Sequence, residues 1–352
     1  MTCDRTLRIA SLRIAVVTLA VLCTPSLAPA QSDPIAEFYK GKTISIVASG
    51  GVGGPIDLAC RIVARHLSRH IPGNPTVVVR NMPGGGHVLM SNFMFTQAPR
   101  DGTYIGGVVN SIPTHQVIDG RGVRFDAGKF IWLGSTGYAN LMTMAWHTSG
   151  FKTIKDVFER ELLTGATGVG SGTYIYTNAM NEILGTKFKM VMGYKDSAAV
   201  DLAIERGEVQ ARGGMTLTGI KQERPHWVAE KKVVMLVQTG AEPEAEFPNV
   251  PLMHDLARND EERQILQLIS APAALGRPFF VPPEVPEDRV AALRKAFAAT
   301  MKDPEYIADG KRVRLDMNPL TAERVTQLVN ATVHAPAAIV EKARAALGTD
   351  KK

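Results

Sequence analysis

Runs of β-branched and apolar residues alternate along this chain with stretches in which apolar residues recur at helical spacing. Residues 43–49 form such a run, and from Asp57 to Ile71 apolar side chains recur every three or four positions. The alternation returns as a short run at 76–79 and a helical stretch at 88–96. Strands that alternate with helices favour a parallel sheet covered by helices on both faces. The pattern therefore predicts an α/β fold.

The same pattern continues through the middle of the chain and changes near its end. Strands are expected at residues 104–109, 130–134, 141–146, 163–168, 188–192, 209–214 and 233–238. Helices are expected between them at residues 152–162, 174–184 and 198–206. From Asp255 onward the pattern is mostly helical. A chain of this length is expected to form two domains.

A glycine loop, Gly50-Gly51-Val52-Gly53-Gly54, joins the first predicted strand to the first long helix. Such a loop presents backbone N–H groups to an anion, because the first turn of a helix has unpaired donors and its dipole favours negative charge. A P-loop needs Lys and Ser or Thr after the last glycine, whereas Pro55 follows here, and Ile56 breaks the dinucleotide pattern. Asp57 would repel a polyanion. The loop thus favours a small carboxylate; the alternative is a tight turn that binds nothing.

Further candidate ligand groups follow other predicted strands. Ligands of such sheets lie beyond the carboxyl ends of the strands, which is where Asn110 and Ser111 are expected. Ser171, Gly172 and Thr173 open the helix predicted at 174–184, and their hydroxyl groups either cap that helix or bind a ligand oxygen.

Tyr194 and Lys195 follow the strand predicted at 188–192. The tyrosine offers a ring and a hydroxyl group. The lysine is either exposed beside Asp196 or lines the site as a cation.

The first thirty residues have the features of a signal peptide. Arg5, Arg8 and Arg13 precede an apolar run from Ile14 to Cys23, which is too short to span a bilayer. Ala28-Pro29-Ala30 supplies a small-x-small cleavage pattern, so we expect an exported protein that begins near Gln31. A signal anchor is the alternative.

Net charge, cysteine count and histidine spacing narrow the possible ligands, cross-links and cofactors. Loss of residues 1–30 removes three Arg and one Asp, so the formal charge falls from +6 to +4. This mild basicity suits anionic solutes and is not typical of a nucleic-acid-binding protein. Cys60 would be the single remaining cysteine, which excludes an intrachain disulfide. His66 and His70 are one helical turn apart, but without a further ligand nearby we interpret them as structural residues and expect no metal or other cofactor.

A series of short motifs resembles the Bug-type extracytoplasmic solute-binding proteins that serve tripartite tricarboxylate transporters. The series comprises Tyr39-Lys40-Gly41-Lys42-Thr43-Ile44, the glycine loop with Asp57 and Arg61, residues 81–86, residues 98–103, residues 168–173, Gly193-Tyr194-Lys195, residues 205–208 and residues 280–283. The motifs occur in the order of that family and extend through nearly the whole mature chain.

This resemblance implies a two-lobed periplasmic binding protein of the type II topology. Each lobe would be a largely parallel sheet flanked by helices, with a cleft between the lobes. The implied division is a signal peptide at 1–30, a discontinuous first lobe at 31–135 plus 255–352, and a second lobe at 136–254. By the same resemblance the backbone amides of Gly51, Val52, Gly53 and Gly54 would hold a carboxylate, and Asp57 would help shape the loop.

Transport is the function that these observations favour. The chain is expected to be a monomeric periplasmic receptor that hands a small carboxylate to membrane permease subunits. A ligand-sensing subunit for a signalling receptor is an alternative. An exported enzyme is a further one, although the chain has no G-x-S-x-G or H-E-x-x-H pattern and no persuasive carboxylate pair.

Overall fold

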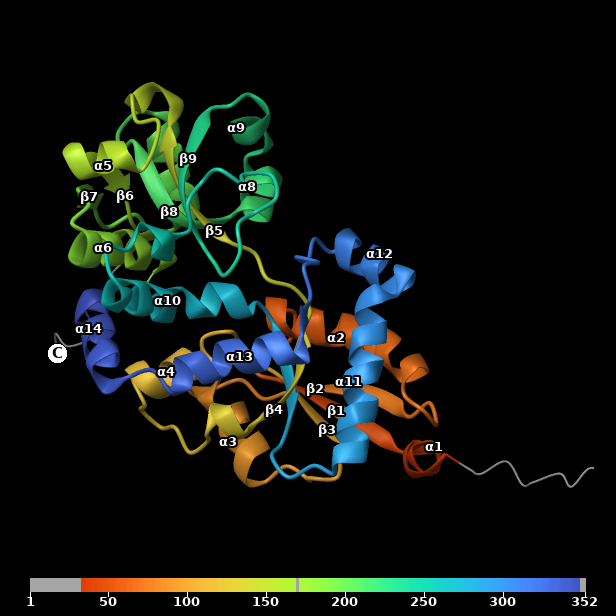
Figure 1. Ribbon diagram of the computed structural model, residues 1–352. Helices are drawn as coiled ribbons and strands as arrows, with labels where there is room; N and C mark the ends of the chain where they lie inside the picture. The colour runs from red at the N-terminus through yellow and green to blue at the C-terminus, as the bar shows by residue number, and fades with distance from the viewer. Residues whose placement is uncertain (1–32, 169–170, 349–352) are drawn as a thin grey trace, which may run out of the picture.

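Two β-sheets build two lobes, which stand one above the other in Figure 1. A computed structural model describes residues 33–168 and 171–348, so the predicted signal peptide lies outside the described residues. The six-stranded sheet of the first lobe has the order β11 (Leu320–Thr321), β4 (Ile131–Ser135), β10 (Pro278–Val281), β3 (Tyr104–Gly107), β1 (Thr43–Ala48) and β2 (Thr76–Asn81). The five-stranded sheet of the second lobe has the order β7 (Phe188–Val191), β6 (Leu162–Gly165), β8 (Ala211–Thr216), β5 (Leu141–Trp146) and β9 (Val233–Thr239).

Both sheets are mixed. β1 pairs in parallel with β2 and β3, and β6 pairs in parallel with β7 and β8. The pairings of β10, β11 and β5 are antiparallel. β4 leads out of the first lobe and β10 returns to it, so the two strands run in opposite directions. The predicted two-lobed α/β fold is confirmed, with the correction that its sheets are mixed and not largely parallel.

Helices cover both faces of the first sheet. Along β1, Ile44, Ile46 and Ala48 pack in one core cluster, whereas Val47, between the last two, packs in another. The first cluster includes side chains of α2 (Pro55–Leu67), α11 (Glu287–Lys302) and α12 (Pro304–Arg312). The second includes side chains of α3 (Val88–Thr96), α4 (Ile112–Ile118) and α13 (Ala322–Val333). The alternation of a buried strand thus fixes the two helix layers.

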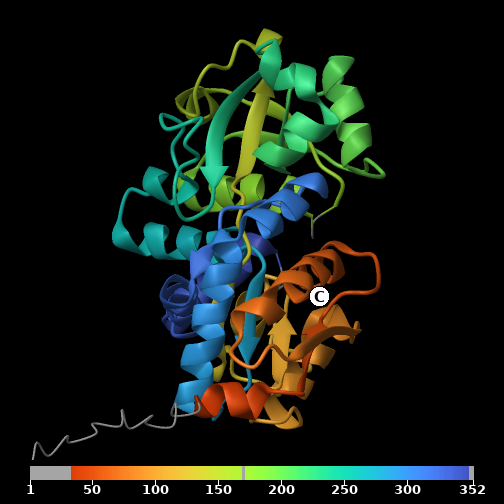
Figure 2. The ribbon, with the colours of Figure 1, turned by 90° about the vertical axis from the view of Figure 1, so that its right-hand side faces the viewer.

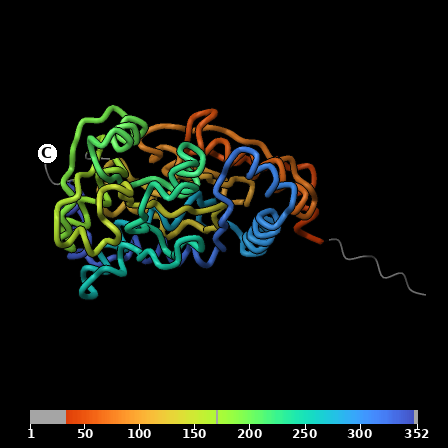
Figure 3. Tube along the Cα trace, turned by 90° about the horizontal axis from the view of Figure 1, so that it is seen from above, coloured from red at the N-terminus to blue at the C-terminus, as the bar shows by residue number. Residues whose placement is uncertain are grey.

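The second lobe has its own two clusters. One contains α7 (Ser197–Glu205), α8 (Leu217–Glu223) and α9 (Pro225–Ala229), and the other contains α5 (Lys155–Glu159), α6 (Gly172–Leu184) and α14 (Ala337–Leu347). The remaining helices are α1 (Pro34–Tyr39), α10 (Asp260–Leu275) and the short 3₁₀ segments η1 (Ser68–His70), η2 (Gly85–His87), η3 (Ala127–Lys129), η4 (His147–Ser149) and η5 (Met253–Leu256). Figure 3, a view from above, shows α1 and α14 at opposite ends of the molecule.

Helix α10 belongs to both lobes. Its residues Leu266 and Ile269 share a core cluster with Leu236 of β9 and Met180 of α6, in the second lobe. Its last residue, Leu275, packs in a cluster of the first lobe. Because α10 contributes to both cores, the division of the lobes at residues 135 and 255 stays a prediction.

The connection between the lobes contains glycines in very close contact. Gly276 follows α10 and has a φ of +64°, a conformation that favours glycine. A Cβ atom at Gly276 would overlap the carbonyl oxygen of Gly137, which lies in the segment between β4 and β5. The two crossing segments therefore touch backbone to backbone.

The predicted strands and helices differ from the structure mainly at their ends. The helix predicted at 152–162 is shorter, Lys155–Glu159, because Leu162 pairs with Phe188 and begins β6. Helix α4 was not predicted. Cys60, in α2, is fully buried and is the free cysteine of the described residues.

Candidate functional site

A buried carboxylate fixes the glycine loop between β1 and α2. The Asp57 side chain accepts hydrogen bonds from the backbone N–H of Gly53 at 2.8 Å, from Arg61 Nε at 2.8 Å and from Asn81 Nδ2 at 2.8 Å. Asp57 is only 1% exposed. The hydrogen bond from Arg61 is the largest influence and, with those from Gly53 and Asn81, outweighs burial, so the pKa of Asp57 is lowered to about 2. Asp57 is therefore an ionised anchor of the loop.

Two of the four candidate loop amides are already used inside the loop. The N–H of Gly53 is bound to Asp57, and the N–H of Gly54 donates to the carbonyl of Gly51 at 3.2 Å. Within the described residues, the N–H groups of Gly51 and Val52 have no hydrogen-bond acceptor. Val52 is 78% exposed, at the tip of the loop. The loop therefore offers two free donors immediately before the 13-residue helix α2, whose N-cap has no side-chain hydrogen bond.

Two residues that were not among the predicted site residues also hold this loop. Asn81, the last residue of β2, donates from Nδ2 to the carbonyl of Gly50 at 2.9 Å. His87 has its Nδ1 atom 3.0 Å from both the carbonyl oxygen and the hydroxyl of Ser49. The sequence signal was the second glycine loop at 81–86, which begins at Asn81 and ends immediately before His87.

Asn110 and Ser111 lie beyond the neighbouring strand. The end of β1 is held beside the end of β3 by a hydrogen bond from the N–H of Ser49 to the carbonyl of Gly107 at 2.9 Å. Asn110 and Ser111 follow Gly107 closely and are half-buried. They thus share an edge of the sheet with the glycine loop, but no hydrogen bond joins their side chains to it in the described chain.

In the second lobe, hydroxyl groups gather at the start of α6. The Thr173 hydroxyl lies 2.6 Å from that of Ser171 and accepts a hydrogen bond from the N–H of Thr167 at 3.1 Å. Ser171 also donates to the carbonyl of Gly168 at 2.7 Å and makes no capping bond to α6. Thr173 is buried, whereas Ser171 and Gly172 are half-buried.

Tyr194 and Lys195 follow β7 in the same lobe. Tyr194 is half-buried, and burial raises the pKa of its hydroxyl. The Lys195 side chain is 84% exposed, with Nζ 4.0 Å from Asp196. Asp196 caps α7 by accepting a hydrogen bond from the N–H of Ala199 at 2.8 Å, so the lysine lies beside a helix cap. Such an exposed ion pair is weak, which leaves the lysine able to reorient.

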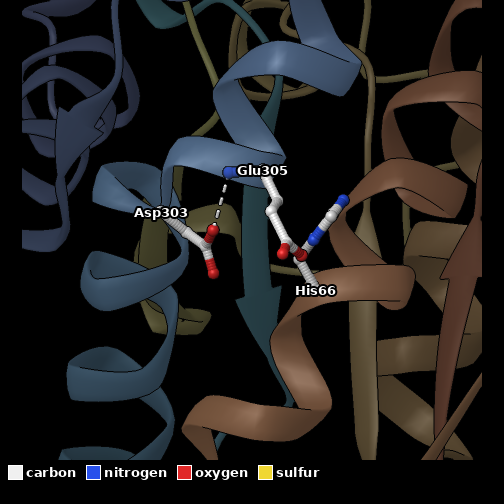
Figure 4. Close-up of side chains that lie close together, drawn as sticks. All are labelled: His66, Asp303 and Glu305. Carbon is white, nitrogen blue, oxygen red and sulfur yellow. Dashed lines mark hydrogen bonds between the residues drawn. The ribbon is translucent and has the colours of Figure 1, made fainter.

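His66 and His70 belong to an ion-pair network between α2 and α12. His66 Nε2 lies 2.9 Å from Asp309, and His70 Nε2 lies 2.8 Å from Asp303. Figure 4 shows Asp303 and Glu305 opposite His66, a grouping whose ligand atoms lie close enough to hold a metal ion. Arg69, however, pairs with both Asp303 and Glu305. A guanidinium group therefore already pairs with both carboxylates, which supports the structural interpretation of the histidines.

Burial alone would raise the pKa of Asp303, but hydrogen bonds from Arg69 and His70 outweigh it and hold that pKa well below its usual range. The ionised carboxylate of Asp303, the N-cap of α12, therefore ties the start of that helix to η1, which follows α2.

Among the described residues, none of the helices has both the length and the apolar character needed to cross a membrane. No family model matches the chain. A UPF0065 protein from the gbd 5′ region of Cupriavidus necator is 26% identical over 348 residues, which is 95% of this chain and 96% of that protein.

Several solved structures share the fold. A TctC solute-binding protein from Polaromonas, without ligand, has a TM-score of 0.70 and 16% identity over 86% of this chain and 99% of its own. Rpa4515 from R. palustris, solved with adipate, has a TM-score of 0.54 and 17% identity over 86% of this chain and 97% of its own. MatC from Rhodopseudomonas palustris, solved with bound malate, has a TM-score of 0.52 and 18% identity over 85% of this chain and 99% of its own. These comparisons confirm the resemblance to the Bug-type solute-binding proteins of tripartite tricarboxylate transporters, and they show that the chain has the two-lobed type II fold of periplasmic binding proteins.

Proposed function

We propose that this chain is a periplasmic receptor that captures a small carboxylate between its lobes and delivers it to membrane permease subunits. The observation that carries the proposal is the glycine loop, in which Asp57 fixes the backbone while the N–H groups of Gly51 and Val52 have no acceptor in the described part of the chain. Donors held in place before binding lose little entropy when a carboxylate arrives, and the dipole of α2 adds to the attraction.

The second lobe would supply the other half of the site. Ser171, Gly172 and Thr173 lie at the start of α6, a helix that likewise begins beyond the end of a parallel strand. Hydroxyl groups can donate to a carboxylate that the loop amides hold from the other side. Malate and adipate, which two of the solved neighbours were found with, carry a carboxylate at each end. A receptor with donors in both lobes suits a solute of that kind.

Transport fits better than catalysis. The predicted site holds backbone amides, hydroxyl groups and one exposed lysine. Ser49 lies beside His87 next to the glycine loop, but it is only 1% exposed and so is not open to a substrate as a nucleophile. The solved neighbours include a TctC solute-binding protein and the periplasmic binding protein BugD. A binding protein needs donors that hold and release a solute unchanged, and this set provides them.

The test begins with a thermal-shift screen of the purified protein against a library of carboxylates that includes malate and adipate. A ligand that binds only the folded protein stabilises it by roughly 2.7 kcal/mol at a hundredfold excess over Kd. Calorimetric titration of the best ligand against Val52→Asp then probes the loop. The new negative charge beside the free amides should lower affinity by more than about tenfold, or about 1.4 kcal/mol.

Val52 is a better position than Gly53 for this test. Gly53 has a φ of +81°, so any side chain there would strain the loop whether or not a ligand binds. The control is Ala298→Asp, which adds the same charge at an exposed position of α11. If Val52→Asp folds and binds as tightly as Ala298→Asp and the parent, the loop is only a turn and the proposed site is wrong.

A further inference from the structure

A second concave site lies between α10, α13 and the segment that leaves β9. This pocket has a volume of about 450 Å³, within the range that small-molecule sites occupy. None of its lining residues belongs to the glycine loop or to the start of α6. In Figure 2 the loop that leads into α2 lies on the right of the molecule, whereas α10, which supplies lining residues of the pocket, lies on the left.

The lining of this pocket combines an apolar base with hydrogen-bonding and basic groups. Its apolar residues include Leu268, Ala271, Ala274, Leu328, Ala331 and Ile339. Its polar residues include Gln264, Gln267, Gln327, His254, His334 and Arg324. No aspartate or glutamate is among the described lining residues. A pocket with a cation, amide and imidazole groups and no carboxylate suits a small organic anion with an apolar body.

Arg324 is available to such an anion. Its guanidinium donates to Gln327 at 3.2 Å and to Glu242 at 3.1 Å. The Glu242 side chain is 63% exposed and that of Arg324 is 38% exposed, so this is a surface ion pair of small net energy. A ligand carboxylate can therefore replace Glu242 as the partner of Arg324 at little cost.

His254 supplies a second unused group. It lies in η5, and its Nδ1 atom is buried with no hydrogen-bond partner in the described chain. A buried polar atom without a partner is costly, and a bound ligand that reaches it removes that cost.

The pocket spans the two lobes. One wall is α10, whose core contacts are largely in the second lobe, and another is α13, whose Val325 and Val329 pack in a cluster of the first lobe. We propose that this pocket is a second binding site, which takes a small monocarboxylate with an apolar body through Arg324. This site is separate from the glycine-loop site and does not depend on it.

Hexanoate is a suitable probe, because it joins one carboxylate to a short apolar chain. Calorimetric titration of the purified protein should show one-site binding of hexanoate, with no binding of the neutral analogue hexanamide. Ala331→Trp should lower the affinity for hexanoate by more than about tenfold, because the indole fills the pocket from an exposed position of α13. Arg324→Gln should lower the affinity for hexanoate to a similar extent, because it removes the positive charge while keeping a side chain that can form hydrogen bonds.

Matched controls separate this pocket from general effects of substitution. Ala298→Trp adds the same bulk at an exposed position of α11, and Arg206→Gln removes an exposed arginine of the second lobe. Both should bind hexanoate within about twofold of the parent. Val52→Asp should also keep hexanoate binding, since it alters only the glycine loop.

Three outcomes would overturn the proposal. The first is no binding of hexanoate up to about 10 mM. The second is binding that Ala331→Trp and Arg324→Gln leave unchanged. The third is binding that Val52→Asp abolishes, which would place hexanoate at the glycine loop. Circular dichroism and thermal unfolding verify that each variant is folded before it is titrated.

Discussion

At the scale of single residues, Asp57 determines the shape of the candidate carboxylate site. Its carboxylate is negatively charged and lies close to a loop proposed to bind an anion. That charge is paired with Arg61, and the same carboxylate accepts hydrogen bonds from the Gly53 N–H and the Asn81 side chain. A buried carboxylate with three donors holds its neighbours more firmly than a neutral acceptor could. The same residue that argues against a polyanion therefore prepares the loop for a small one.

Asp57 also predicts a dependence of stability on pH. Its pKa in the folded protein, about 2, lies below the ordinary value of 3.8, so the unfolded chain takes up this proton at a higher pH. The stability it contributes is present above about pH 4 and is lost as the pH falls toward about 2. Urea unfolding measured in steps between neutral and acidic pH should show the parent losing stability, and Asp57→Asn should lose less over the same interval.

Asp288→Asn is the control for this measurement, because Asp288 is exposed on α11. The unfolding free energy of Asp288→Asn should change with pH as steeply as that of the parent. An Asp57→Asn variant whose unfolding free energy changes with pH as steeply as that of the parent would contradict the assignment of Asp57 as an ionised anchor.

The sequence predicted the glycine loop and Asp57, but it missed two residues that complete the loop. Asn81 and His87 reach it from the end of β2, across sequence separations of 31 and 38 residues. Periodicity and local motifs describe neighbours along the chain, whereas these contacts depend on the order of strands in the sheet. Ser171 was expected either to cap α6 or to bind a ligand oxygen; its hydroxyl contacts Gly168 and Thr173 and makes no capping bond, so the ligand role stays a prediction.

At the scale of elements, β1, the strand that leads into the glycine loop, was predicted well because it is short, largely apolar and buried. The helix predicted at 152–162 failed at its end, since pairing of Leu162 with Phe188 outweighs local helical preference. The antiparallel direction of β10 could not be predicted from its composition. It follows from the return of the chain through α10, which is a property of the topology.

The segment after α10 gives a sharp prediction. Gly276→Ala should destabilise the protein by more than about 2 kcal/mol, because the new methyl group would overlap the backbone of Gly137 and the residue would keep a positive φ. Chemical unfolding measures the change.

Gly185→Ala isolates the steric part of this effect. Gly185 also has a positive φ, +78°, but a Cβ atom there would meet nothing within 4 Å. Gly185→Ala should lower the free energy of unfolding by only about 1 kcal/mol. Equal losses in the two variants would mean that the contact between Gly276 and Gly137 adds nothing to stability.

At the scale of the whole molecule, two lobes joined by close backbone contacts are suited to closing on a solute. Each lobe is proposed to contribute only part of the donor set, so we expect closure to be favoured when one ligand engages both. Small-angle X-ray scattering with the best carboxylate of the thermal screen should give a smaller radius of gyration than the free protein. Val52→Asp, which is expected to bind poorly, should show no decrease at the same concentration. An unchanged profile of the parent at saturation would count against closure.

The buried cysteine of α2 has a practical consequence for following such a movement. Burial raises the pKa of the Cys60 thiol, and a buried thiol that stays protonated reacts poorly with alkylating reagents. Once the predicted signal peptide is removed, no other cysteine remains in the chain. Two exposed residues outside the proposed site, Ala298 of α11 in the first lobe and Met192 in the second, can therefore be changed to cysteine and labelled with a pair of dyes without altering the rest of the sequence. The energy transfer between those dyes would report the separation of the lobes in single molecules.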